Sequence, residues 1–313
     1  MSADKRRKTI YKVLRMYYVD NLTQNEIANR LSISRIKVAR YIYYAKAHKL
    51  VETKLNFPIN ENDELETEFE NKYGLKECRI VPSFENIEDT YKYIAIELAD
   101  ILGRILNDDE YVGISWGTTL EGVSRYLKLN KKINVNVIPV TGAIGIQGQD
   151  NSTNFVIKNF ADKIGGRYYP IHIPNIVDSK KAKKILEADS QTRNIIELNK
   201  KLSTVILAVS AASLDTSFSR LGAFNQKDID YLDSLGVVGI LNFEFLNAAG
   251  ELVENMINDR IVRILPFESI RKIKNSILIS WGPKKVEILK ACIKNKNINI
   301  LLTDEETARA ISC

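Results

Sequence analysis

Short apolar runs alternate with longer amphipathic stretches from near Cys78 to the C-terminal end, and this pattern limits the possible folds more than any other in the sequence. The apolar runs have the length of buried strands, and the amphipathic stretches have the three- and four-residue spacing of helices. Such alternation is typical of an α/β fold with a mostly parallel sheet. We expect strands at 111–115, 135–140, 204–209, 237–241, 276–280 and 298–302, and helices at 90–106, 118–128, 152–164, 180–200, 226–235 and 284–295.

Positive charge is concentrated in the first 54 residues. This segment carries 13 Lys and Arg against 4 Asp and Glu, whereas the remainder has 32 basic and 35 acidic residues, so the net charge of +6 originates in the N-terminal segment. A short basic segment suits a polyanion, because neutralising phosphates releases their counterions. Charge alone leaves a merely solvated basic surface equally open.

The same segment has the spacing of a helix-turn-helix. A first helix is expected over residues 8–20, and Thr23 with Glu26 forms the capping box of a second helix. Ser34 can cap a third helix, whose first side chains would meet base edges in the major groove. A packing module that never touches DNA is the alternative. The DNA-binding residues expected are Thr23, Gln24, Ser34, Arg35, Lys37 and Arg40; Ile36, Ala39, Ile42 and Tyr43 are expected to face inward, and residues 49–55 to form a short strand or wing.

Two domains are expected. Pro58 interrupts the chain, and residues 60–72 turn acidic with apolar residues on one helical face, which indicates a connecting helix rather than a flexible linker. The boundaries predicted are an all-α helix-turn-helix domain over residues 1–56 and a Rossmann-like α/β domain over 57–313, with the connecting helix inside 57–75.

Three loops that follow predicted strands are candidate ligand-binding segments, because ligands of parallel α/β sheets bind at the carboxyl ends of the strands. In the first loop a glycine and two hydroxyls precede a helix, an arrangement that suits an anion, although an ordinary helix start has the same residues. The third loop ends in two lysines that could neutralise a phosphate or face solvent. The binding residues expected are Gly117, Thr118 and Thr119; Thr141, Gly142, Ala143 and Gln149; and Gly282, Lys284 and Lys285.

Several classes of function are disfavoured. His48 and His172 are the only histidines, and the three cysteines are scattered, so we expect no metal site, no histidine-based catalytic triad and no cofactor. The three loops contain neither of the glycine-rich nucleotide-binding motifs. No apolar run is long enough to span a membrane, and the charged N-terminal residues are not a secretory signal, so we expect a cytoplasmic protein.

These motifs, in this order, resemble the SorC family of sugar-responsive bacterial transcriptional regulators across essentially the whole chain. The resemblance implies a tetramer that binds operator DNA, and a sensor domain related in fold to sugar-phosphate isomerases. It also implies a phosphorylated-sugar effector, whose phosphate meets the Thr118–Thr119 loop and the lysines of the third loop. The segments that carry the resemblance are Gln24–Arg40, Gly113–Leu120, Arg220–Gly222, Ile257–Arg260 and Leu301–Ala308.

The chain departs from the family pattern at positions that bear on the ligand. Gly142-Ala143 replaces a common glycine pair, Trp281 stands where a small residue is common, and Ile240 stands where an acidic residue is common. Thr141 occupies a position where some relatives have a lysine that could form a Schiff base with an aldehyde sugar. We therefore expect an effector that differs from those of the best-known relatives.

Three functions are weighed. The first is a transcriptional regulator of a carbohydrate operon, whose affinity for DNA is controlled by a phosphorylated sugar. The second is a sugar-phosphate isomerase or deaminase with an appended DNA-binding domain, and the third is an architectural DNA-binding oligomer. An enzyme needs a general acid and base, and we expect none, because no spacing singles out a pair among the available carboxylates Asp150, Glu244, Asp304 and Glu305.

Overall fold

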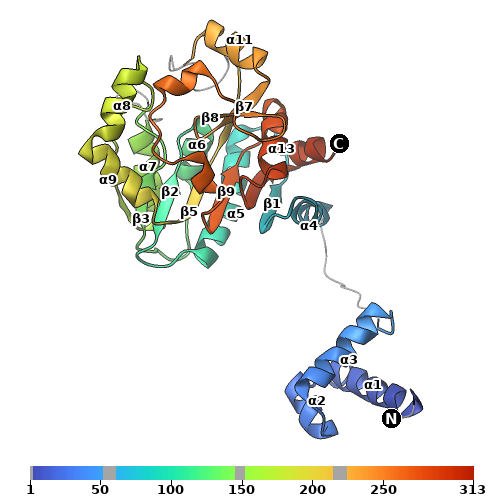
Figure 1. Ribbon diagram of the computed structural model, residues 1–313. Coiled ribbons are helices and arrows are strands. Elements are labelled where there is room, and N and C mark those ends of the chain that lie inside the picture. The colour runs from blue at the N-terminus through green and yellow to red at the C-terminus, as the bar shows by residue number, and fades with distance from the viewer. Residues whose placement is uncertain (1–2, 52–60, 145–151, 214–223) are drawn as a thin grey trace. The chain divides into compact units, whose positions relative to one another are not determined.

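The chain forms two compact units, Met1–Pro58 and Ile59–Cys313. The computed structural model describes residues 3–51, 61–144, 152–213 and 224–313 (Figure 1). Among the described helices, none combines the length and the apolar composition that a membrane span requires.

Three helices make up the described part of the first unit: α1 (Ala3–Tyr18), α2 (Gln24–Leu31) and α3 (Arg35–Ala47). The hydroxyl of Thr23 accepts the N–H of Glu26 at 3.3 Å, and the carboxylate of Glu26 accepts the N–H of Thr23 at 2.7 Å, which completes the expected capping box. Ser34 caps α3 by accepting the N–H of Lys37. These caps fix where α2 and α3 begin, and hence the short turn between them.

The face that α3 buries differs from the predicted one. Ile36 and Tyr43 were expected inside, but they are 73% and 76% exposed. The buried residues recur at i, i+3, i+4 and i+7, the spacing of one helical face. Apolar residues lie on both faces of α3, so the pattern alone is ambiguous, and packing against Val13 of α1 and Ile27 of α2 decides which face is buried. The buried side chains of α3 are Val38, Tyr41, Ile42 and Ala45.

The chain after α3 does not form the expected short strand in its described part. Residues 48–51 form a turn and a bend, and residues 52–55 lie outside the described residues.

The second unit contains a seven-stranded sheet in the order β1-β10-β9-β5-β2-β3-β4, in which every neighbouring pair is parallel. The expected α/β fold is confirmed. All carboxyl ends of these strands therefore lie at one edge of the sheet. The strands are β1 (Glu77–Val81), β2 (Tyr111–Ile114), β3 (Asn136–Pro139), β4 (Arg167–Tyr168), β5 (Leu202–Leu207), β9 (Asn275–Ile279) and β10 (Ile300–Asp304).

Helices cover both faces of this sheet, and successive strand residues alternate between two apolar clusters (Figure 1). Ile206 belongs to one cluster, whereas its neighbours Val205 and Leu207 belong to the other. This alternation explains why the strands read as continuous apolar runs. One face is covered by α5 (Ile87–Ile105), α6 (Thr118–Tyr126) and α7 (Thr153–Ile164), and the other by α4 (Glu61–Tyr73), α13 (Val286–Lys294) and α14 (Glu305–Ser312).

A second, antiparallel sheet of three strands corrects two of the predicted strands. The run 204–209 divides at Ala208 between β5 of the large sheet and β6 (Val209–Ala211) of the small one. The run 237–241 is strand β7 (Val237–Leu241), but it pairs with β6 and with the unpredicted β8 (Glu244–Asn247) rather than with the large sheet. A run of apolar residues reports burial, and it carries no information on which sheet a strand joins.

The expected helix over 180–200 is two helices, α8 (Lys180–Ala188) and α9 (Ser190–Asn199). Asp189 separates them, because its extended backbone ends α8 and its carboxylate accepts the N–H groups of Gln191 and Thr192 at the start of α9. The remaining short elements are α11 (Gln226–Ser234), η1 (Met256–Arg260), α12 (Phe267–Ile270) and η2 (Pro283–Lys285).

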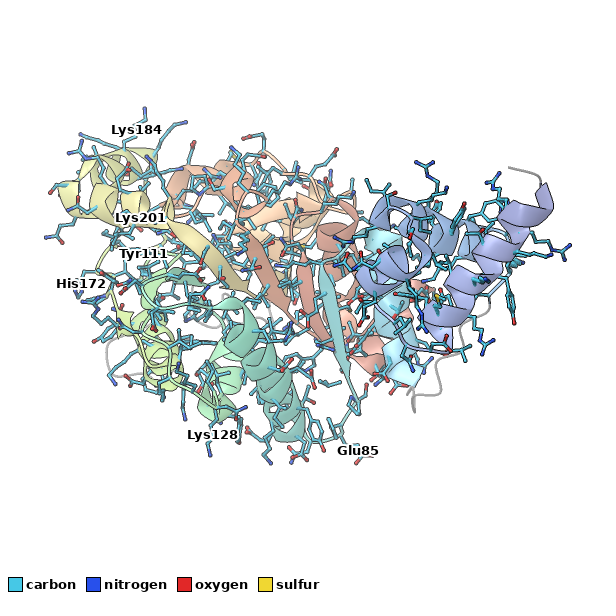
Figure 2. All side chains as sticks on the ribbon, turned by 90° about the horizontal axis from the view of Figure 1, so that it is seen from below. Glu85, Tyr111, Lys128, His172, Lys184 and Lys201 are labelled. Carbon is cyan, nitrogen blue, oxygen red and sulfur yellow. The ribbon has the colours of Figure 1, made fainter. Side chains whose placement is uncertain are left out.

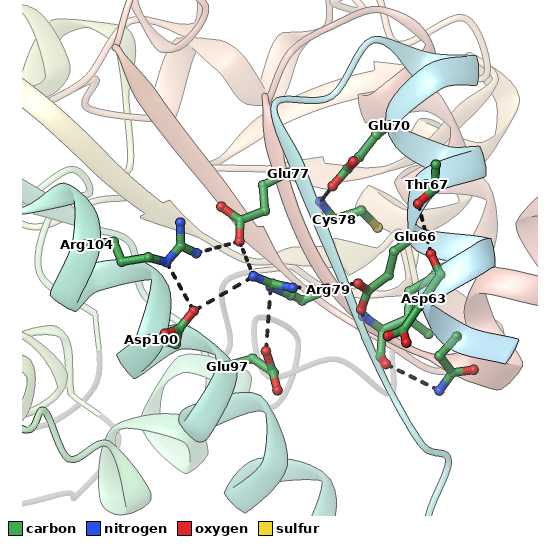
Figure 3. A network of polar contacts seen from close by, with 12 residues as sticks. Asp63, Glu66, Thr67, Glu70, Glu77, Cys78, Arg79, Glu97, Asp100 and Arg104 are labelled. Atoms are coloured by element: carbon green, nitrogen blue, oxygen red, sulfur yellow. Dashed lines mark hydrogen bonds and ion pairs between the residues drawn. The ribbon is translucent and has the colours of Figure 1, made fainter. Parts of the chain in front are cut away.

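The connecting helix α4 is attached to the edge strand β1 through its own acidic side chains (Figure 3). The carboxylates of Glu66 and Glu70, one helical turn apart, accept the N–H groups of Ile80 and Cys78 at 2.7 and 2.9 Å. These alternate N–H groups face away from β10, so α4 satisfies donors that an edge strand otherwise leaves unpaired. The acidic composition that marked this helix in the sequence is therefore part of its attachment to the sheet.

Candidate functional sites

The exposed face of α3 in the first unit is basic. Arg35, Lys37 and Arg40 are all exposed. Thr23 and Ser34 are the N-caps of α2 and α3, and Gln24 is the first residue of α2, so the six residues expected to bind DNA lie on α3 or at these two helix starts. Free N–H groups at helix starts and basic side chains are the donors that phosphates accept from.

The first unit also has a basic groove that sequence reasoning did not single out. Its volume is about 790 Å³, and most of its polar side chains are cationic. The concentration of charge in residues 1–54 was the available signal, but it does not say which cations share one surface. The groove is lined by Arg7, Lys8, Tyr11, Lys12, Arg15, Met16, Asp20, Arg30 and Leu31.

In the second unit, the loops after β2 and β9 meet at the carboxyl edge of the sheet, on either side of β5. Gly117 (φ 154°) and Gly282 (φ 102°) precede α6 and η2 in backbone conformations that favour glycine, and neither offers a side-chain cap to the helix that follows. The ammonium of Lys285 donates to the hydroxyl of Thr119 at 3.1 Å across this edge. The first and third predicted loops are thus joined by a direct contact.

Lys285 lies in an environment that is unfavourable for an unpaired charge. Its side chain is partly buried at the end of the third loop, and burial lowers the pKa of its ammonium to about 8. Within the described part of the chain, no carboxylate forms an ion pair with it, and Thr119 is a neutral acceptor. An anion bound here would supply the missing countercharge.

Several buried hydroxyls near the carboxyl ends of the strands lack hydrogen-bond partners among the described residues. Thr141 follows β3, Ser280 follows β9 and Thr303 lies near the end of β10, and each is at most 2% exposed. Buried polar groups are almost always satisfied in folded proteins. Their concentration at this edge indicates hydroxyls available to water or to a polar ligand.

The second loop is held in place by an asparagine that the sequence did not suggest. Asn175 accepts the N–H of Gly142 at 2.8 Å, and its buried amide nitrogen has no partner among the described residues. A Cβ at position 142 would lie 2.4 Å from the Cα of Asn175, so glycine is required by this approach. Ala143 follows, and it forms an isolated parallel bridge with Pro174.

Asn242 is a second residue that sequence reasoning missed. It lies between β7 and β8 with a positive φ of 51°, accepts from the hydroxyl of Ser115 at 3.2 Å, and donates to the carbonyl of Val140 at 3.3 Å. It therefore ties the ends of β2 and β3 together from the small sheet. No local pattern marks such a residue, because its partners are about one hundred positions away in the chain.

Of the remaining predicted binding residues, Thr118 and Lys284 are exposed, whereas Thr119 is buried. Gln149 lies outside the described residues. Trp281 is partly buried, and its ring packs against that of Tyr91 on α5 in an edge-on arrangement with the centroids 5.5 Å apart.

The opposite edge of the sheet, at the amino ends of the strands, has a cation–π contact. There the ammonium of Lys201 lies 5.4 Å from the ring centroid of Tyr111, at the starts of β5 and β2 (Figure 2).

The carboxylates weighed for enzymatic catalysis have structural partners. Glu244 accepts two hydrogen bonds from Arg263 at 2.7 and 2.9 Å. Asp304 caps α14 by accepting the N–H of Thr307, and Glu305 pairs with Arg309 one turn along that helix. Asp150 lies outside the described residues, and His172 is exposed on the surface (Figure 2). The described side chains include no group of three or more His, Cys, Asp and Glu that could hold a metal ion.

Comparisons with known proteins identify the family. A family model described as "Putative sugar-binding domain" matches residues 57–311. The chain is 29% identical over 318 residues to the deoxyribonucleoside regulator of Bacillus subtilis (strain 168), with 99% of each protein covered. It is 22% identical over 300 residues to the erythritol catabolism regulatory protein EryD of Brucella abortus (strain 2308), with 95% of this chain and 93% of that protein covered.

The fold of the whole chain is also similar to that of a solved regulator. The crystal structure of the full-length sorbitol operon regulator SorC from Klebsiella pneumoniae superposes with a TM-score of 0.74, at 22% identity and with 99% of both chains covered. That similarity covers the helical unit as well as the α/β unit. The family model over residues 57–311, with regulators that match the chain along nearly its whole length, shows that this chain belongs to the SorC family of sugar-binding transcriptional regulators.

Proposed function

We propose that this protein binds operator DNA through α3 and that a phosphorylated sugar, bound at the carboxyl edge of the large sheet, controls its affinity for that DNA. The contact between Lys285 and Thr119 is the observation that carries the second part. A phosphate placed there would meet the partly buried ammonium, the hydroxyl of Thr119 and the uncapped N-terminus of α6. These are the groups that bind phosphate in proteins.

The sugar moiety is proposed to meet the hydroxyl of Thr141 and the second loop. Thr141 is 2% exposed and its hydroxyl has no partner in the described structure, so it can bond a ligand hydroxyl that enters this edge. A threonine cannot form an imine with an aldehyde, so the proposed binding at this position is non-covalent. Relatives are named for deoxyribonucleosides, erythritol and sorbitol, which supports a small polyhydroxylated ligand without naming one.

The regulation is proposed to follow from two states of the protein with different affinities for DNA. The effector changes their populations only through its different affinity for the two states. A homotetramer, as a dimer of dimers, would present several α3 helices to repeated half-sites. Sedimentation equilibrium of the whole chain tests this assembly, and a monomer at micromolar concentration would contradict it.

The second unit is proposed to bind its ligand without converting it. Glu244, Asp304 and Glu305 are engaged in ion pairs or helix capping, which leaves none of these three as a ready general acid or base. Turnover of any sugar phosphate in the binding screen would contradict this.

Replacing Lys285 by Met tests the proposed effector site. Operator affinity without effector should be unchanged, whereas the effector concentration needed for a half-maximal response should rise at least tenfold, because the countercharge for phosphate is lost. The measurement is fluorescence anisotropy of labelled operator DNA, titrated with a panel of sugar phosphates at constant salt.

Two further variants sharpen this test. Lys294→Met, an exposed lysine at the far end of α13, is the matched control and should respond like the unchanged protein. Lys284→Met distinguishes the two adjacent lysines. If it raises the effector concentration for a half-maximal response more than Lys285→Met does, the phosphate contacts the exposed Lys284 instead. A normal effector response in Lys285→Met would refute the proposed site.

A further inference from the structure

The exposed face of α3 contains a large apolar side chain that the first unit does not use for packing. Ile36 is 73% exposed at the second position of the helix, and it is absent from the apolar cluster that holds α1, α2 and α3 together. Its neighbours Arg35 and Lys37 are also exposed. An apolar group thus stands in the middle of a basic surface.

The position of Ile36 places it on the stripe of α3 that faces away from the core. Residues 36, 40 and 43 follow the i, i+4, i+7 spacing of one helical face, and all three are exposed. The opposite stripe, from Val38 to Ala45, is buried. If Arg40 faces DNA, as the sequence predicts, Ile36 faces the same groove one turn nearer the start of the helix.

A branched aliphatic side chain has one chemically distinct partner in the major groove. The groove edges of the bases are hydrogen-bond donors and acceptors, except for the C5-methyl group of thymine. Contact between that methyl group and the Ile36 side chain would remove apolar surface of both from water. Cytosine has no methyl group at C5, so it cannot make this contact.

We propose that Ile36 is a specificity-determining residue that reads the C5-methyl group of one thymine in each half-site. This inference rests on the proposed function, because it requires α3 to enter the major groove. The basic residues around Ile36 can contact phosphates or the acceptors of guanine, whereas Ile36 would discriminate thymine from cytosine at one position.

The test removes the methyl group from the DNA and the side chain from the protein. An operator is selected from a random duplex library with the full-length protein, and each thymine is then replaced in turn by deoxyuridine, which lacks only the methyl group. We expect one position per half-site at which this replacement weakens binding three- to tenfold. Ile36→Ala should weaken binding to the unmodified operator by a similar factor. This variant should bind the deoxyuridine operator as tightly as it binds the unmodified operator, because the contact with the methyl group is already lost.

Val19→Ala is the matched control, since Val19 is an apolar side chain of the first unit that is 69% exposed and lies outside α3. It should leave the affinity and the deoxyuridine profile unchanged. A far-ultraviolet circular dichroism spectrum and a melting temperature equal to those of the unchanged protein show that Ile36→Ala is folded.

The outcomes distinguish this inference from the proposed function. Specific binding with no methyl-sensitive thymine, or an unchanged deoxyuridine profile in Ile36→Ala, refutes the role of Ile36 and leaves operator binding intact. If the selection yields no preferred sequence for the unchanged protein, the proposed function fails, and the inference fails with it.

Discussion

Lys285 shows how one residue can acquire a function from its surroundings. The adjacent Lys284 has the same chemistry and is exposed, whereas the ammonium of Lys285 lies against Thr119 and has its pKa lowered to about 8 by burial. Removing a charge from water without a countercharge is unfavourable. The same environment makes the residue a strong partner for an anion that enters the site.

The affinity for a phosphorylated effector should therefore depend on pH in a way that Lys285 controls. A phosphate monoester gains its second charge near pH 6, so affinity should rise through that region. Above pH 8, the free protein loses the ammonium proton that the complex retains, and affinity should fall by up to about tenfold per pH unit. Isothermal titration calorimetry between pH 6 and 9.5 measures both the rise and the fall in affinity.

In Lys285→Met the alkaline decrease should disappear while the rise near pH 6 remains. If the decrease above pH 8 persists in this variant, another group is responsible for it.

At the scale of elements, the attachment of α4 to β1 depends on a cluster of charges (Figure 3). Arg79 on β1 lies within 4 Å of the carboxylates of Glu66, Glu77, Glu97 and Asp100, which come from α4, β1 and α5. Burial raises the pKa of Glu66 to about 7, although the N–H of Ile80 and the charge of Arg79 act to lower it. The connecting helix is thus attached by a carboxylate that folding makes easier to protonate.

Glu66 should make stability fall as pH rises. Its pKa is higher in the folded chain than the ordinary 4.5, so between pH 4.5 and 7 the folded state binds more protons than the unfolded one, and the free energy of unfolding decreases with pH. Glu66→Gln removes this titration but keeps an acceptor for Ile80.

The melting temperature of Glu66→Gln, relative to that of the unchanged protein, should therefore increase between pH 5 and pH 8. Differential scanning calorimetry measures this difference. Glu64→Gln, an exposed glutamate on the same helix, is the control and should show no such trend. A constant difference across this range in Glu66→Gln would contradict the prediction.

At the scale of the whole molecule, charge is divided between the two units. Residues 1–54 have a large excess of basic over acidic residues, whereas the remainder of the chain is slightly acidic. The basic groove of the first unit and the exposed face of α3 hold most of these cations. DNA affinity should then depend on salt through the first unit alone.

Arg30→Ala, in the basic groove, should lower the slope of log affinity against log salt by about one unit if it contacts one phosphate. Lys184→Ala, exposed on α8 of the second unit, should leave the slope unchanged (Figure 2). Fluorescence anisotropy between 50 and 300 mM salt measures both. Equal slopes for Arg30→Ala and the unchanged protein would exclude Arg30 from the phosphate contacts.

Features that depend on neighbours along the chain can be predicted from the residues alone. The capping box of Thr23 and Glu26, the cap at Ser34 and the glycines before α6 and η2 could be read because each involves residues within a few positions. The succession of buried strands and amphipathic helices was legible for the same reason, and it was enough to predict a parallel α/β fold.

Features that depend on residues far apart in the chain are set by tertiary contacts. These contacts determine which apolar face of α3 is buried and divide the run 204–209 between two sheets. They also position Asn242 between the ends of β2 and β3. The same packing partly buries the ammonium of Lys285 and leaves Lys284 exposed. Burial and desolvation are set by contacts between distant segments, so no local pattern of residues records them.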